Sequence, residues 1–194
     1  MSYRVQWIAV RGRSESEILA RFGFAKASQG GDDTCIGGEL EGGWYVVAVY
    51  DDTGRFDDED EMRDFSRGGA ILHCTIIESV TSSFATFYEN GEIAWRLSHS
   101  GDSDDPYDLQ VRGTMPPQFE RLRAAAIAAQ KQADAEYAQD ESAGTVDMMF
   151  DLPIDLAESV CGFHHIGRDD ENAALNDRYS CLIELPPDGG WLRA

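Results

Sequence analysis

Positively charged residues are scarce in this sequence of 194 residues. Lysine and arginine together number 16, aspartate and glutamate together number 36, and the formal net charge is −20. Nucleic acids and anionic membrane surfaces would repel such a chain. We therefore expect no direct binding to nucleic acid and no association with a membrane. The partner that this charge favours is a basic protein.

Long apolar runs and cysteine motifs are also missing. No apolar run approaches the ~20 residues that a helix needs to cross a bilayer, and residues 1–7 lack the apolar centre of a secretory signal. The cysteines at positions 35, 74, 161 and 181 show no C-x-x-C spacing, which argues against a zinc ribbon or a thioredoxin-like motif. We expect a cytoplasmic protein whose cysteines are reduced.

The common cofactor and hydrolase motifs are absent as well. The sequence contains no G-x-G-x-x-G, P-loop, H-E-x-x-H or G-x-S-x-G pattern, so we predict no cofactor. The chain does contain enough apolar material for a core, since 42% of its residues are hydrophobic, including 4 Trp, 7 Tyr and 9 Phe. At this length, a single domain over 1–194 is the simplest expectation.

Hydrophobic periodicity and turn residues divide the chain into strands and helices. The Gly- and Asp-rich segment 25–43 indicates mostly loop. Adjacent strands precede the longest helix, which predicts an α+β fold: one mostly antiparallel or mixed sheet of about six to eight strands with packed helices. The expected strands are 5–10, 44–50, 70–78, 84–89, 92–98, 107–112, 146–150 and 179–185, and the expected helices are 14–22, 57–65, 116–137 and 153–161.

Three local patterns predict more detail. Ser14 and Glu17 have the S-x-x-E spacing of a capping box, which begins a helix. The same order of expected elements, a strand, a turn, a helix and then Gly-Phe, occurs twice. The segments 5–50 and 146–185 could therefore form a degenerate βαβ-like repeat, and chance is the alternative. Asn90-Gly91 predicts a two-residue hairpin turn with the Trp95 face toward the core. The register expected from that turn pairs Tyr88 with Ile93, Thr86 with Trp95, and Phe84 with Leu97.

Histidine and carboxylate residues gather after the helix expected at 153–161. His164 and His165 are followed by Asp169, Asp170 and Glu171. Imidazole and carboxylate groups bind several divalent cations, so His164 and His165 are the candidate metal ligands. The spacing matches no known ligand pattern, and a solvated loop is the alternative interpretation.

The other two histidines, His73 and His99, give weaker indications of a functional site. His73 and Cys74 are neighbours in an expected strand, so their side chains point to opposite faces and cannot form a local catalytic dyad. His99 lies between two serines, but no oxyanion-hole motif accompanies it. An enzyme would have to combine one or more of the histidines His73, His99, His164 and His165 with distant carboxylates, with or without a metal.

Negative charge is concentrated in two blocks. Residues 27–66 carry 12 acidic and 2 basic groups, and residues 138–194 carry 12 acidic and 3 basic groups. Clustered carboxylates steer basic proteins toward a surface; the alternative is a set of solvated loops. The candidate partner-binding residues of the first block are Asp57, Asp58, Asp60 and Glu61.

Several stretches together resemble an uncharacterised family of bacterial proteins, and the resemblance covers most of the chain. It implies a small cytoplasmic bacterial protein, and since no activity is known for that family it implies no catalytic residues. The acidity and size are also similar to those of bacterial toxin-immunity proteins. The stretches are Trp7 to Gly12, Phe22-Gly23-Phe24, Gly42 to Val47, Met115 to Phe119, Val146 to Pro153, and Gly162-Phe163-His164.

Two hypotheses for the function follow. The first is a non-enzymatic binding protein, of the immunity type for example, whose acidic surface meets a basic partner. The second is an enzyme with an unfamiliar histidine and carboxylate site that a metal could assist. A regulatory or assembly module is a third interpretation, which a large apolar interface would reveal.

Overall fold

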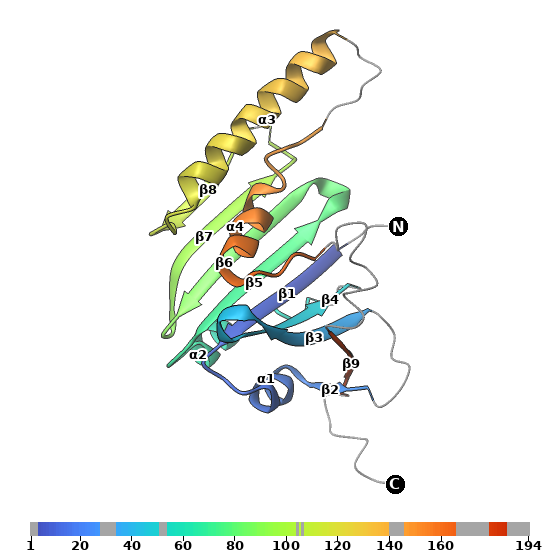
Figure 1. The fold of residues 1–194 in the computed structure, drawn as a ribbon, viewed down its shortest axis with the longest axis vertical. Coiled ribbons are helices and arrows are strands. Elements are labelled where there is room, and N and C mark those ends of the chain that lie inside the picture. Colours follow the sequence, from blue (N-terminus) through green and yellow to red (C-terminus); the bar gives the residue numbers. More distant parts are fainter. Residues whose placement is uncertain are drawn as a thin grey trace.

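A single nine-stranded antiparallel sheet organises the protein (Figure 1). The computed structural model describes residues 4–27, 34–50, 54–103, 105, 107–139, 146–165 and 179–185. The strand order across the sheet is β2-β9-β3-β4-β1-β5-β6-β7-β8. The strands are β1 (Arg4–Arg11), β2 (Phe24–Lys26), β3 (Cys35–Leu40), β4 (Trp44–Val49), β5 (Ala70–Ile77), β6 (Ser82–Glu89), β7 (Glu92–Ser100), β8 (Gln110–Gly113) and β9 (Ser180–Glu184).

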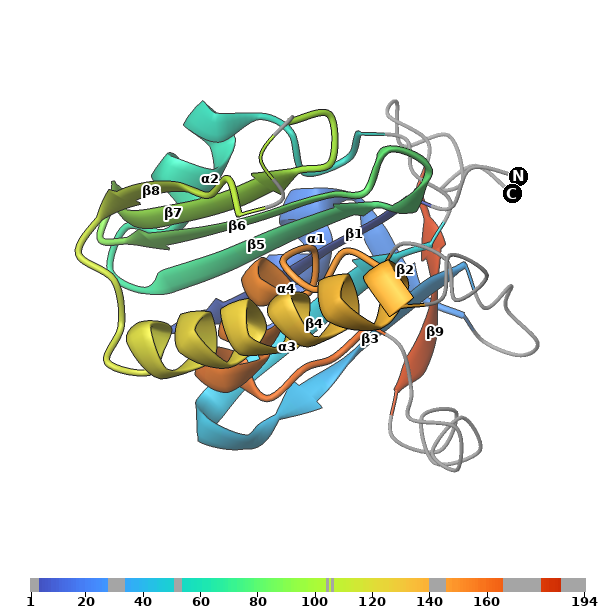
Figure 2. The ribbon, with the colours of Figure 1, turned by 90° about the horizontal axis from the view of Figure 1, so that it is seen from above.

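Helices cover both faces of the sheet. They are α1 (Glu15–Phe22), α2 (Glu59–Phe65), α3 (Phe119–Gln139) and α4 (Leu152–Cys161). The first two pack on one face, around Ile8 and Val10, and the last two lie over the other face, around Trp7 and Ala9 (Figure 2). The described part of the chain contains no helix with the length and apolarity needed to span a bilayer.

This three-layer arrangement explains the continuous apolar runs of the central strands. Every residue of β4 is buried, and so are the six residues of β1 from 5 to 10. Side chains alternate between the two faces of a strand, so a strand covered on both faces needs apolar residues at every position. The expected α+β fold with a mostly antiparallel sheet is confirmed. The predicted capping box is present too, because Ser14 and Glu17 each accept the other's backbone N–H.

The segment 25–43, expected to be mostly loop, also contains β3 and most of β2, which the sequence did not predict. Adjacent glycines in β3 hid the strand, since glycine has low strand propensity. The structure gives Gly37 a packing role: a Cβ atom there would lie 2.8 Å from Leu182 Cδ1 and 3.2 Å from the Tyr45 hydroxyl. A side chain at this position would therefore force the Leu182 side chain of β9 to move.

The hairpin register is correct only next to its turn. Tyr88 pairs with Ile93 as predicted, but a β-bulge at Ala94 shifts the rest of the pairing. Thr86 then faces Arg96 instead of Trp95, and Phe84 faces Ser98 instead of Leu97. The shift brings Trp95 opposite Phe87, where the rings stack with centroids 5.7 Å apart. Trp95 is only 3% exposed, so its predicted place in the core is confirmed.

The strand expected at 146–150 is also absent. Residues 148–150 form a turn that leads into α4. The Asp147 carboxylate accepts hydrogen bonds from the backbone N–H groups of Met149 (3.1 Å) and Phe150 (3.2 Å), which fixes the turn. The proposed repeat of 5–50 and 146–185 therefore lacks the strand that would begin its second copy.

Candidate functional site

A cleft of about 480 Å³ lies between the end of β7 and the C-terminal half of α3. Strand β7 and the loop after it form one wall, α3 forms another, and the segment that enters α4 closes the inner end. Two carboxylates and one histidine line the cleft, and none of the described lysines or arginines does. The residues that matter below are His99, Ser100, Gln130, Asp134, Tyr137 and Asp147.

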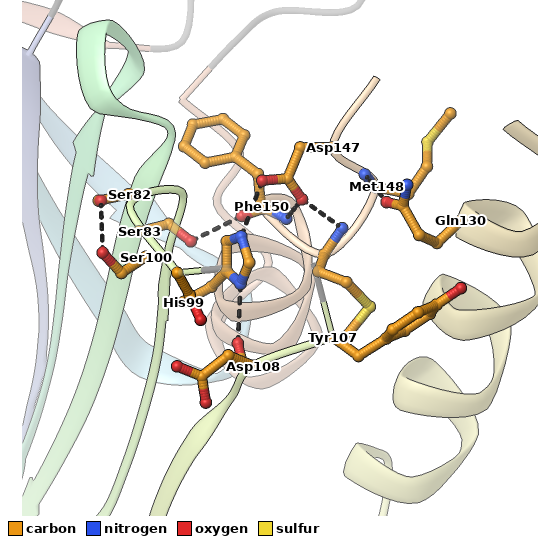
Figure 3. A network of polar contacts seen from close by, with 12 residues as sticks. Ser82, Ser83, His99, Ser100, Tyr107, Asp108, Gln130, Asp147, Met148 and Phe150 are labelled. Atoms are coloured by element: carbon orange, nitrogen blue, oxygen red, sulfur yellow. Dashed lines mark hydrogen bonds and ion pairs between the residues drawn. The ribbon is translucent and has the colours of Figure 1, made fainter. Parts of the chain in front are cut away.

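His99 lies at the inner end of the cleft with both ring nitrogens in hydrogen bonds (Figure 3). It follows Trp95 and Leu97 on the core-facing side of β7 and is 2% exposed. Its Nδ1 is 2.8 Å from the Asp108 carbonyl oxygen, and its Nε2 is 2.8 Å from Asp147 Oδ2. A carbonyl and an ionised carboxylate only accept hydrogen bonds. Nδ1 therefore donates to the Asp108 carbonyl oxygen, and Nε2 is held by the Asp147 carboxyl group.

This geometry leaves His99 no nitrogen with which to take a proton. A general base accepts a proton from the attacking group, but the two ring nitrogens of His99 already face Asp108 and Asp147. Ser100 is adjacent in the chain but gains no activation from this ring. The contacts of His99 with Asp108 and Asp147 are therefore structural, and the neighbouring serines are not part of a catalytic triad with it.

Gln130 joins α3 to the segment before α4 (Figure 3). The side chain is 3% exposed. Its Nε2 donates to the Val146 carbonyl oxygen at 3.0 Å and to Asp134 Oδ1 at 2.9 Å, and its Oε1 accepts from the Met148 N–H at 2.7 Å. These bonds position Asp134, whose other oxygen accepts from the Tyr107 hydroxyl at 3.0 Å.

The charges of the cleft do not balance. Asp147 has His99 as its hydrogen-bond partner, and its side chain is one-quarter exposed. Asp134 is exposed and takes its two hydrogen bonds from the neutral groups of Gln130 and Tyr107. Among the described residues Asp134 therefore has no cationic partner, and it shares the cleft with the ring of Tyr137, which is 38% exposed. Such a combination favours a cationic group.

The predicted metal ligands lie elsewhere, beyond the C-terminus of α4. His164 comes close to Asp155 and Glu158 of that helix, and one donor atom from each residue lies within 4.8 Å of the other two. Asp169, Asp170 and Glu171 lie outside the described residues. Asp151 lies just before the first residue of α4. Burial raises the pKa of its carboxyl group. Nearby His164 lowers this pKa, and Asp147 raises it further.

His165 lies against His164 but in a drier environment. The two rings stack with centroids 5.0 Å apart. His165 is 4% exposed, and neither of its ring nitrogens has a hydrogen-bond partner among the described residues. Burial, with a smaller effect from His164, lowers the pKa of His165 to about 3. This imidazole is therefore neutral at pH 7.

The predicted partner-binding residues lie at the start of α2, and most of them have structural contacts. Asp57 accepts hydrogen bonds from Gln6 at 2.5 Å and from Arg4 at 3.4 Å. Asp58 caps the helix by accepting the Glu61 N–H at 3.0 Å. Glu61 pairs with Arg21 at 2.9 Å. Asp60 is exposed. Because arginines pair with Asp57 and Glu61, this surface is less negative than its sequence indicated.

His73 is separated from the cleft by the sheet. Its Nε2 lies 3.1 Å from Thr75 Oγ1 and its ring packs edge-on against Phe56, on the α2 side. Cys74 faces the opposite core, as the strand period predicted. Burial lowers the pKa of His73 to about 4. Of the four histidines, His99 alone lines the cleft.

A scan against protein-family models and searches of curated proteins and of solved structures found no match. The resemblance to a bacterial family therefore stays an expectation from the sequence.

Sequence reasoning missed the cleft because its parts are far apart in the chain. His99 and Asp147 are separated by 48 residues. One signal was present: Trp95, Leu97 and His99 alternate in step, which places the histidine on the buried face of β7. A buried histidine needs polar partners, but nothing local identified Asp147 as one of them.

Proposed function

We propose that this protein is a non-enzymatic binding protein whose cleft receives a cationic side chain from a basic protein partner. The observation that carries the proposal is the exposed Asp134 carboxylate in a cleft that no described lysine or arginine lines. The net charge of −20 supports it, because that charge attracts basic surfaces over long distances and repels nucleic acid. An immunity-type inhibitor is one protein of this kind.

The shape and chemistry of the cleft favour arginine over lysine. A volume of about 480 Å³ falls within the usual range for ligand pockets. The ring of Tyr137 can stack on a planar guanidinium while Asp134 accepts its N–H groups, and an ammonium group gains less from a flat ring. The alternative of an enzyme gains less support, because His99 has both nitrogens in use.

The test is an NMR titration of the isotope-labelled full chain with N-acetylarginine amide. N-acetyllysine amide is the second ligand, and N-acetylnorleucine amide is the uncharged control. We expect arginine to shift the amide resonances of the cleft most strongly, norleucine to shift them little, and added salt to weaken binding. The expected effect of Asp134→Asn is roughly tenfold weaker binding, because a hydrogen bond to a charged acceptor is lost.

Glu136→Gln is the matched control, since Glu136 is an exposed carboxylate on the same helix that does not line the cleft. Equal weakening by both substitutions would show a diffuse charge effect and would overturn the proposal. Equal shifts from norleucine would overturn it as well.

A further inference from the structure

The C-terminal end of α4 brings three metal-binding side chains together, away from the cleft. Asp155 and Glu158 are three residues apart, so they lie on one side of the helix. Gly162 ends the helix in the left-handed conformation (φ 79°) and donates its N–H to the Glu158 carbonyl oxygen at 2.7 Å. This turn reverses the chain and brings His164 back toward both carboxylates.

The donor atoms are close enough for one ion. All three lie within 4.8 Å of one another, and ligands of a metal held at roughly 2.0–2.2 Å lie at most about 4.4 Å apart. Small side-chain rotations would close that difference. The site lies at the surface, because Asp155 is exposed and Glu158 and His164 are half-buried, so an ion has access from solvent.

A second observation at the same place is the environment of His165. Its ring stacks on that of His164, is 96% buried, and has no hydrogen-bond partner for either nitrogen within the described ranges. Buried polar atoms are normally paired, and an exception calls for an explanation such as a bound ion.

We propose that Asp155, Glu158 and His164 bind a divalent transition-metal ion of the Zn²⁺ class, beside the buried ring of His165. The mixture of imidazole and carboxylate selects the metal, because imidazole suits zinc, whereas Mg²⁺ and Ca²⁺ prefer all-oxygen sites. The site spans the end of α4 and the segment after it, so the ion would hold the two together.

The experiment measures Zn²⁺ affinity of the full chain, freed of metal with a chelator, by competition with a chromophoric indicator. We expect one tight site per chain, and about tenfold or greater weakening in Glu158→Gln and His164→Ala. Glu120→Gln is the matched control, because Glu120 is exposed in the first turn of α3. Millimolar Ca²⁺ should not displace the zinc.

Cobalt substitution separates this site from the cysteines. Co²⁺ bound to nitrogen and oxygen donors gives weak visible absorption, whereas a thiolate ligand adds an intense ultraviolet charge-transfer band. A charge-transfer band would overturn the proposal, because a cysteine would then hold the metal. Displacement by Ca²⁺, or equal weakening in Glu120→Gln and Glu158→Gln, would overturn it too, because the binding would then come from diffuse negative charge. An unchanged affinity in His164→Ala would overturn it too.

Discussion

Gln130→Ala should release α3 from the rest of the protein without unfolding the sheet. Gln130 is one of only two fully buried residues in this 21-residue helix, and the other is Phe119. The substitution removes three hydrogen bonds and leaves the N–H of Met148 without its acceptor. Two of these bonds join α3 to the segment before α4. At about 1 kcal/mol for each of the two, with a similar cost for the orphaned N–H, the loss is on the order of 3 kcal/mol.

The lost free energy should appear as more frequent local opening of α3, because helices with little buried surface open separately from the core. A loss of about 3 kcal/mol corresponds to roughly 100-fold faster hydrogen exchange, since about 1.4 kcal/mol is a factor of ten. Native-state hydrogen exchange read by mass spectrometry would compare peptides from α3 with peptides from β5 and β6. We expect the acceleration in α3 alone.

Gln132→Ala is the control, because Gln132 is exposed on the same helix and bonds only to Glu136 in the described structure. Equal acceleration of α3 exchange by both substitutions would refute the reasoning, since helix propensity would then explain the effect. Equal acceleration in β5 would also refute it, because α3 would then open only together with the sheet.

Three further predictions concern the core. His73 has a native pKa near 4 against about 6.5 in the unfolded chain; the unfolded state binds more protons between these values, so stability should fall as pH drops through that window. Urea titrations at pH 7 and pH 4.5 would measure the fall in the free energy of unfolding. The fall should be smaller in His73→Gln than in the unsubstituted protein, by on the order of 1–3 kcal/mol. An equal fall in both proteins would contradict this. Trp7 is fully buried, packs edge-on against Phe163, and has no hydrogen-bond partner for its indole N–H within the described structure. Trp7→Ala should cost about 3–5 kcal/mol in chemical denaturation and Trp7→Phe under about 1.5 kcal/mol, whereas similar costs would mean that the indole N–H has a partner. Burial raises the pKa of the Cys161 thiol to about 12, so native-state alkylation followed by peptide mapping should modify the partly exposed Cys181 well before Cys161, and the reverse order would argue against this packing.

The sequence predicted those parts of the fold that local patterns encode. The apolar run of β4 indicated a strand, and Ser14 with Glu17 marked the start of α1. Asn90-Gly91 located the hairpin. The bulge at Ala94 escaped prediction because turn chemistry specifies only the pairs next to the turn, whereas the bulge goes with a cross-strand contact, the stacking of Trp95 on Phe87.

The site was less predictable, because its contacts are tertiary. His164 was identified as a metal-binding candidate, but the pattern pointed to the acidic residues after it, whereas the described partners lie before it in α4. A glycine that reverses the chain after a helix brings later residues back beside earlier ones. The acidic residues at the start of α2 were identified by charge alone, and charge does not show that Glu61 already has a partner in Arg21.

The position of β9 has a consequence for the order in which the sheet can be assembled during synthesis. This strand lies between β2 and β3, so β2 reaches the sheet only through it. While the ribosome is still upstream of residue 180, β3 remains an open edge and β2 has no strand to pair with. An interrupted chain would keep that edge exposed, and open edges recruit other strands. A chain cut before residue 180 would therefore retain the open β3 edge that pairing with β9 covers.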